Sequence, residues 1–204
     1  DFGDLRESME ARCGFSDGSR GCSIGGSGPS GYGIEIDYVT IATLGNAAEF
    51  GDATAAGDSY SGLSDCTYGL FAGKNNSSSN AIDKITIATL GNAVDWADLT
   101  WVMRKGTALA NGTRGLWGGG KSPDSNIIQY ITVATQANCI DFGDLTVARE
   151  SLGGNTDATK GVFGGGGWPS KNVIDYVTIA TTGNAADFGD LTLARSAVMS
   201  GCSG

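Results

Sequence analysis

The alternation of apolar and polar residues predicts short β-strands throughout this chain. In the segment Ile174-Asp-Tyr-Val-Thr-Ile-Ala-Thr, alternation places Ile174 and Tyr176 on one face of a strand and Asp175, Val177 and Ile179 on the other. Both faces carry apolar residues, which indicates a strand covered on both sides. No window shows the apolar spacing of three and four residues that a helix of three turns requires. We therefore predict an all-β protein.

The same segments recur at a nearly constant interval. Asp-Phe-Gly-Asp-Leu, or a near copy, begins at five places: Asp1, Glu49, Asp95, Asp141 and Asp187. The last four lie 46 residues apart, and the first interval is 48 residues. Such a period marks a chain of supersecondary units that stack on one another. We predict a single domain over residues 1–204, with units of about 1–48, 49–94, 95–140 and 141–186 and a partial unit over 187–204.

Each unit contains sequence for four strands. One strand follows an Ala-Arg region, one ends in a run of glycines, one is the Ile-Asp-Tyr segment, and one surrounds Phe-Gly-Asp-Leu-Thr. Four antiparallel strands in about 40–50 residues, with a glycine pair, are the sequence signature of a propeller blade. The repeat therefore predicts a β-propeller.

The unit resembles the kelch-type repeat, which has a glycine pair closing its second strand, an aromatic residue in the third and an aromatic residue opening the fourth. The matching residues are Gly164-Gly165 with Tyr176 and Phe188, Gly118-Gly119 with Tyr130 and Phe142, and Gly25-Gly26 with Tyr38 and Phe50. The second unit departs from the pattern, with Ala72-Gly73 as the pair, Lys84 for the tyrosine and Trp96 at the second aromatic position. Kelch-like repeats serve many functions, so the resemblance implies a fold more than an activity.

The near-identical sequences of the tandem repeats are also similar to repeats in bacteriophage and marine viral structural proteins. This resemblance rests on sequence motifs such as Asp-Phe-Gly-Asp-Leu-Thr and Asp-Tyr-Val-Thr-Ile-Ala-Thr. It implies a viral structural or tail and adhesin type of protein, with the virion as its location. Nothing else in the sequence indicates a location.

The strand count sets the expected number of blades. Four complete blades run from about Glu7 to the region of Thr192, while Asp1–Leu5 adds an outer strand and Ser196–Gly204 an inner one, giving eighteen strands. We expect five radial positions, the last of them incomplete, with a four-bladed ring as the alternative. Unpaired strand edges recruit partners, so an incomplete blade favours self-association through its open edge.

Charge and composition narrow the classes of partner. The formal net charge is −9 and the isoelectric point is about 4.3, which argues against binding to nucleic acid or anionic membranes. No apolar stretch reaches about 18 residues, so we expect no membrane insertion. The five cysteines fall at different places in the repeat, which favours buried apolar side chains over a disulfide framework or a metal site.

The chain has few residues suited to catalysis. It contains no histidine, the commonest general base and the usual partner of a serine or cysteine nucleophile. We expect no catalytic residues, no metal, no cofactor and no enzyme activity. The aspartates that recur with the repeat are each expected to cap a turn through backbone amides. They are Asp4, Asp52, Asp98, Asp144 and Asp190. Their spacing does not favour a calcium loop, which places several acids within about a dozen residues. The repeated arginines are expected to pack and to contact turns. They are Arg12, Arg104, Arg149 and Arg195.

The loops after the glycine-rich strands vary most between units, and binding usually resides in loops on a rigid scaffold. The candidate binding residues in these loops are Lys74, Asn75, Lys121, Asp124, Trp168 and Lys171. Trp117 lies within a glycine-rich strand and is expected in the core. The expected function is a non-catalytic propeller scaffold that binds a protein or a glycan. The alternative is a lectin whose repeated weak sites gain avidity.

Overall fold

The computed structural model describes residues 1–74, 79–121 and 123–196, which form eighteen β-strands and no helix. The prediction of an all-β protein is confirmed. Without helices, the described residues contain no candidate helix for crossing a membrane.

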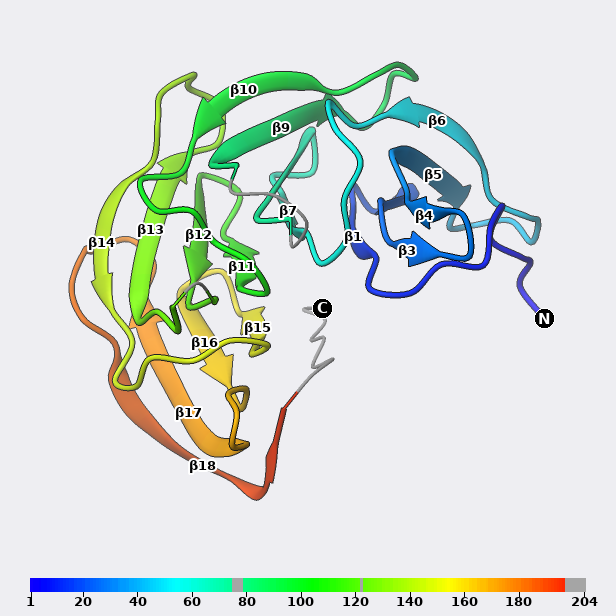
Figure 1. Ribbon diagram of the computed structural model, residues 1–204. Helices are drawn as coiled ribbons and strands as arrows, with labels where there is room; N and C mark the ends of the chain where they lie inside the picture. The colour runs from blue at the N-terminus through cyan, green and yellow to red at the C-terminus, as the bar shows by residue number, and fades with distance from the viewer. Residues whose placement is uncertain (75–78, 122, 197–204) are drawn as a thin grey trace.

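Sixteen of the strands form four antiparallel sheets of four strands each (Figure 1). The first sheet contains β1 (Cys13–Ser16), β2 (Arg20–Ile24), β5 (Glu35–Thr40) and β6 (Ala48–Asp52). The second contains β7 (Ser61–Ser64), β8 (Tyr68–Ala72), β9 (Ala81–Thr86) and β10 (Val94–Asp98). The third contains β11 (Thr107–Ala110), β12 (Arg114–Gly118), β13 (Ile127–Thr132) and β14 (Ile140–Asp144). The fourth contains β15 (Gly153–Thr156), β16 (Lys160–Gly164), β17 (Lys171–Thr178) and β18 (Ala186–Arg195).

The four strands predicted in each unit are all present, but the total of eighteen is reached differently. The two additional strands are a hairpin of β3 (Ser27–Gly28) and β4 (Gly31–Tyr32), which lies between β2 and β5. Residues Asp1–Leu5, predicted as an outer strand, are not part of any strand. Of the predicted inner strand at Ser196–Gly204, residues 197–204 lie outside the described residues.

The four sheets follow one another along an arc, with the first strand of each sheet toward the inside and the last strand toward the outside (Figure 1). The inner strands pack in sequence, β1 on β7, β7 on β11 and β11 on β15. This arrangement is compatible with a propeller-like fold. A glycine in the second strand of each of the last three sheets allows the inner strands to approach closely. An added Cβ at Gly69, Gly115 or Gly161 would meet the side chain of Phe15, Leu63 or Leu109 in the preceding sheet.

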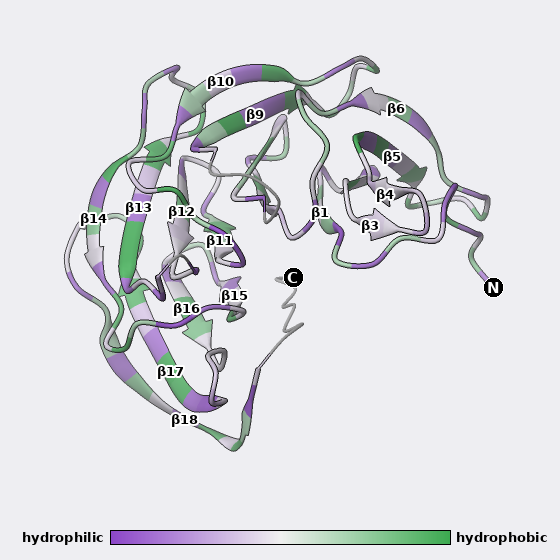
Figure 2. Ribbon diagram, viewed as in Figure 1, coloured by the Kyte–Doolittle hydropathy of each residue, from purple (hydrophilic) through white to green (hydrophobic). Residues whose placement is uncertain are grey.

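The hydrophobic core lies between neighbouring sheets. Among the described residues, three buried clusters occupy the three junctions between consecutive sheets, centred on Phe71, Trp117 and Phe163. All three aromatic side chains are fully buried, which confirms the prediction that Trp117 belongs to the core. Figure 2 shows apolar segments alternating with polar ones along the strands that supply these clusters, as in β9 and β13.

A repeated set of hydrogen bonds joins the outer edge of each sheet to the next sheet. In the first junction, the Phe50 carbonyl accepts from the Gly91 amide at 2.9 Å, and the Asp52 amide donates to Asn92 Oδ1 at 3.0 Å. The same amide-to-asparagine bond recurs in the next junctions, from Asp98 to Asn138 and from Asp144 to Asn184. Asp52, Asp98 and Asp144, which were predicted to cap turns with their side chains, thus contribute their main-chain amides to the junctions between sheets.

Residues Asp1–Leu5 occupy this same place before the first sheet. The Phe2 carbonyl accepts from the Gly45 amide at 2.9 Å, and the Asp4 amide donates to Asn46 Oδ1 at 3.0 Å. The segment thus acts as the outer edge of a preceding sheet without belonging to a β-strand.

The fourth sheet ends in a junction that no described residue fills. Phe188 is 58 % exposed, whereas its equivalents Phe50 and Phe142 are 3 % and 2 % exposed. The space beside Gly189 is open, whereas Gly51 and Gly143 lie against the backbone of the following loop. Within the part of the chain that the structure describes, the arc is therefore open at β18.

The aromatic positions shared with kelch-type repeats contact each other across the third and fourth strands. The ring centroids of Tyr130 and Phe142 lie 5.7 Å apart, edge to face, and those of Tyr176 and Phe188 lie 5.8 Å apart. In the second sheet, Lys84 Nζ lies 3.0 Å from the ring centroid of Trp96. A cation–π contact therefore replaces the aromatic pair in the divergent unit.

Candidate functional site

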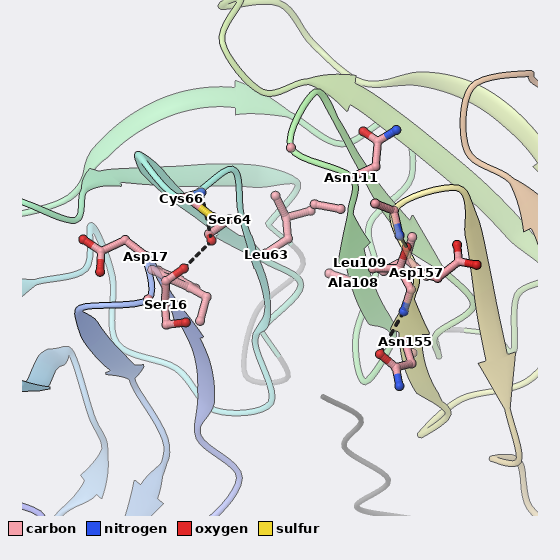
Figure 3. Close-up of a pocket in the computed structure, with 17 residues that line it drawn as sticks. Ser16, Asp17, Leu63, Ser64, Cys66, Ala108, Leu109, Asn111, Asn155 and Asp157 are labelled. Carbon is pink, nitrogen blue, oxygen red and sulfur yellow. Dashed lines mark hydrogen bonds between the residues drawn. The ribbon is translucent and has the colours of Figure 1, made fainter. Parts of the chain in front are cut away.

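A cavity lies inside the arc and is lined by residues of all four sheets (Figure 3). Its volume is about 690 Å³. The turns that join the first and second strands of each sheet surround it, so residues that are far apart in sequence face the same space. The lining residues labelled in Figure 3 are Ser16, Asp17, Leu63, Ser64, Cys66, Ala108, Leu109, Asn111, Asn155 and Asp157.

An aspartate or asparagine fixes each of these turns. Asp17 Oδ1 accepts from the amides of Ser19 and Arg20, both at 2.7 Å, and Asp157 Oδ1 accepts from those of Thr159 and Lys160 at 2.8 and 2.6 Å. The turns at Asp65 and Asn111 have the same pair of bonds. These main-chain hydrogen bonds lower the pKa of the Asp17 and Asp157 carboxyls below the usual aspartate value. Both side chains therefore remain ionised at neutral pH.

Hydroxyl, amide and carboxylate groups supply hydrogen-bond acceptors around the cavity. The Ser64 hydroxyl donates to the Ser16 carbonyl at 2.6 Å and accepts from the Cys66 amide. Carboxylates with a lowered pKa are poor general acids near neutral pH. No group of three or more acidic or sulfur ligands suited to a metal occurs among the described residues. The arrangement suits a neutral polyol or a cationic group that enters between the turns.

A sequence motif marks the turns around this cavity, although the binding residues were predicted in other loops. Asp17-Gly-Ser, Asp65-Cys-Thr, Asn111-Gly-Thr and Asp157-Ala-Thr share one pattern at the repeat interval. An acid or amide two residues before a hydroxyl residue is typical of a side-chain-capped turn. The pattern predicts the turns, but only the arrangement of the sheets brings them together.

The residues predicted to bind lie at the opposite ends of the strands, because they follow the second strand rather than the first. Trp168 is 84 % exposed. Lys171 begins β17 and pairs in register with Arg195 of β18. Trp168 lies in the loop between β16 and β17, and both side chains are accessible to a partner.

The other predicted binding residues belong to the second and third sheets. Lys121 Nζ forms an ion pair with Glu150 Oε1 at 2.9 Å, and Asp124 is exposed nearby. Lys74 lines a small cavity beside Asp83, and Asn75 lies outside the described residues. In the described part of the chain, no hydrogen bond or ion pair joins one of the loops that carry these candidates to another. They do not form one site.

The glycine pairs have the structural role that the sequence indicated, with a shift in position. The glycine pairs that follow the second strands of the first, third and fourth sheets have positive φ, and they are Gly25-Gly26, Gly119-Gly120 and Gly165-Gly166. In the third and fourth sheets this pair lies one residue after the pair expected from the sequence. A side chain at these positions would strain the backbone, so the glycines shape the exit from the second strand.

Cysteine reactivity provides a test of the cavity. Cys66 is exposed and lines it, whereas Cys22 and Cys139 are buried, which raises their pKa values to about 11 and about 12. In a Cys202→Ser background at pH 8, we expect a maleimide to modify Cys66 about a hundredfold faster than Cys22 or Cys139, because the thiolate is the reactive form. Peptide mapping by mass spectrometry measures the rates. Equal rates at the three cysteines would contradict the placement of Cys66.

The comparisons with known proteins give no family. No protein-family model matches the chain, and the curated proteins include no significant match.

Proposed function

We propose that this chain is a non-catalytic scaffold of the β-propeller type, with five radial positions of which the last is incomplete. It associates with other macromolecules through its open end. The observation that carries the proposal is the unfilled junction at β18. Phe188 is exposed and the space beside Gly189 is open, whereas Phe50 and Phe142 are buried and Gly51 and Gly143 lie against the backbone of the following loop. Exposed apolar groups on a strand edge favour association.

The partner proposed for the open end is another repeat unit of the same kind, from a second copy or from a longer chain. Residues Asp1–Leu5 and Asp187–Leu191 are identical in sequence, so each fits a loop such as Gly45–Ala47. The first sheet also presents the complementary face, because Ile41 is 44 % exposed whereas its equivalents Ile87 and Ile179 are fully buried. The two ends of the arc are therefore complementary to each other.

A viral structural protein, of the tail or adhesin type, is the setting that we propose for this scaffold. The support is the resemblance of the tandem repeat sequences to repeats in viral structural proteins. A scaffold that adds units end to end suits an assembled particle, since heterologous interfaces extend until they close.

Light scattering coupled to size exclusion tests the association. We expect the chain of 20.7 kDa to elute as an oligomer, and Phe188→Asp to elute as a monomer. Leu90→Asp is the matched control, because Leu90 is 52 % exposed but lies away from the open end, and it is expected to leave the oligomer unchanged. A chain without residues 1–5 is expected to associate more tightly, since no segment competes for the loop at Gly45–Ala47. A monomeric parent chain at all concentrations would contradict the proposal.

A lectin is the second candidate function, and the exposure of Trp168 supports it. An 84 % exposed indole beside Lys171 offers a surface on which a sugar ring stacks. A glycan array tests this candidate. Binding in the millimolar to micromolar range that is lost in Trp168→Ala supports the lectin, whereas an array without binding removes it.

A further inference from the structure

One buried polar site recurs in all four sheets, at the same position of the third strand. The side chain there is Asp37, Asp83, Gln129 or Asp175, and each is nearly inaccessible to solvent. In the last three sheets a threonine from the preceding junction donates to it, as Thr54 Oγ1 does to Asp83 Oδ1 at 2.7 Å. Comparing the four copies shows what the site holds.

In the fourth sheet, the site holds a guanidinium group. Arg149 is fully buried, and its Nη1 lies 2.8 Å from Asp175 Oδ2. Its Nε and Nη2 donate to the carbonyls of Gly165 at 2.8 Å and Phe163 at 3.1 Å. The buried carboxylate thus has a cation, and the cation has main-chain acceptors, as a buried ion pair requires.

In the first sheet, the buried acid is also paired with an arginine. Arg12 comes from a different backbone position, but its Nη1 lies 2.8 Å from Asp37 Oδ2 and its Nη2 donates to the Ser23 carbonyl at 3.1 Å. Ser23 and Phe163 are equivalent, because each pairs in register with the acid of its sheet. In the third sheet both charges are replaced, with Gln129 in place of the acid and the buried Met103 in place of the arginine.

Only the second sheet keeps the acid without an arginine. Gly57 stands at the position of Arg149, and Tyr60 stands at the position of Arg12 with its hydroxyl donating to the Ala55 carbonyl at 2.7 Å. Asp83 is 4 % exposed and, within the described residues, has no ion-pair partner. Burial raises the pKa of its carboxyl, and the hydrogen bonds from Thr54 and the charge of Lys74 offset this only in part.

A cavity lies where the arginine is missing. Its volume is about 160 Å³, and its lining includes Thr54, Ala55, Tyr60, Gly73, Lys74 and Asp83. A water molecule, with one heavy atom, takes about 30 Å³ in the liquid, and a guanidinium group has four heavy atoms. The cavity is larger than four such volumes, so it has room for a guanidinium group. Ala55 and Gly73 are the equivalents of Val147 and Gly165, whose carbonyls accept from Arg149 in the fourth sheet.

We infer that the cavity beside Asp83 binds a guanidinium group that comes from outside the chain. The carboxylate supplies the charge, and the cavity wall supplies the planar acceptors that a guanidinium needs. The inference rests on comparison between the sheets and is independent of the proposed function.

Titration with methylguanidinium chloride, followed by amide chemical shifts, tests the inference. We expect a saturable shift at Thr54 with a dissociation constant on the order of millimolar, the range for a ligand of about five heavy atoms. Sodium chloride and tetramethylammonium chloride at equal ionic strength are expected to give no saturable shift. N-acetylarginine amide distinguishes the source, because it binds only if the cavity admits an arginine side chain of a partner. Binding of either compound supports a guanidinium site beside Asp83.

Two variants make the test specific. Gly57→Arg restores the arginine of the repeat, and it is expected to weaken methylguanidinium binding at least about tenfold while raising the melting temperature. The backbone suits the change, because Gly57 makes the same main-chain bonds as Arg149, donating to a carbonyl and accepting from a glycine amide. Asp83→Asn removes the charge and is expected to give the same loss.

Met103→Ala is the matched control. It opens the equivalent place in the third sheet, where Gln129 carries no charge, and is expected to create no binding at Thr100 while leaving the shift at Thr54 unchanged. Three results would overturn the inference: no saturable shift in the parent chain, undiminished binding in Asp83→Asn, or binding that appears only in Lys74→Met. The last result would mean that Lys74 already neutralises the site.

Discussion

Replacement of Arg149 by methionine is expected to lower the free energy of unfolding by about 3–5 kcal/mol, the usual effect of removing one partner of a buried ion pair. The substitution leaves Asp175 with no cation in a site where both side chains are inaccessible to solvent. It also leaves the carbonyls of Gly165 and Phe163 without their donors. Denaturant unfolding measures the loss.

The third sheet provides the compensating change. There Met103 and Gln129 fill the positions of Arg149 and Asp175, and the Gln129 amide donates to the Trp101 carbonyl. We therefore expect the double variant Arg149→Met/Asp175→Gln to lie within about 1–2 kcal/mol of the parent chain, because a neutral, packed pair often replaces a buried ion pair at little loss. A double variant as unstable as Arg149→Met alone would show that the sites of the four sheets are not equivalent.

The strands and the core followed from the sequence because both depend on local pattern. Alternation around Ile174 and the 46-residue interval were enough to predict four strands in each unit, and the apolar strand around Trp117 was enough to predict its burial. The hairpin of β3 and β4 was missed, since strands of two residues contain too little alternation to be recognised.

The cavities did not follow from the sequence, for two different reasons. The turns at Asp17 and Asp157 are far apart in the chain, and only the packing of successive sheets places them around one space. The cavity beside Asp83 is visible in sequence only as a glycine at position 57 where another unit has arginine. That difference gains meaning once the acid is known to be buried.

Replacing the phenylalanine of the last strand by alanine is expected to affect stability very differently in the third and fourth sheets. Phe142→Ala is expected to lower the free energy of unfolding by about 3–5 kcal/mol, because it empties a fully packed place between the third and fourth sheets. In the monomeric chain, at a concentration too low for association, Phe188→Ala is expected to lower it by less than about 1 kcal/mol, since Phe188 there loses only its edge-to-face contact with Tyr176. The two variants share chemistry and repeat position, and differ in the presence of a following sheet.

The energetic effect of Phe188→Ala in an elongated chain tests most directly whether the open end takes one further unit. The elongated chain repeats residues 150–195 once after Arg195, which supplies a fifth sheet with its own loop to cover Phe188. Stabilities of neighbouring repeats add through their interfaces, so a filled junction makes Phe188 energetically equivalent to Phe142. We predict that Phe188→Ala lowers the free energy of unfolding of the elongated chain by about 3–5 kcal/mol. A loss below about 1 kcal/mol, as in the parent chain, would contradict the account.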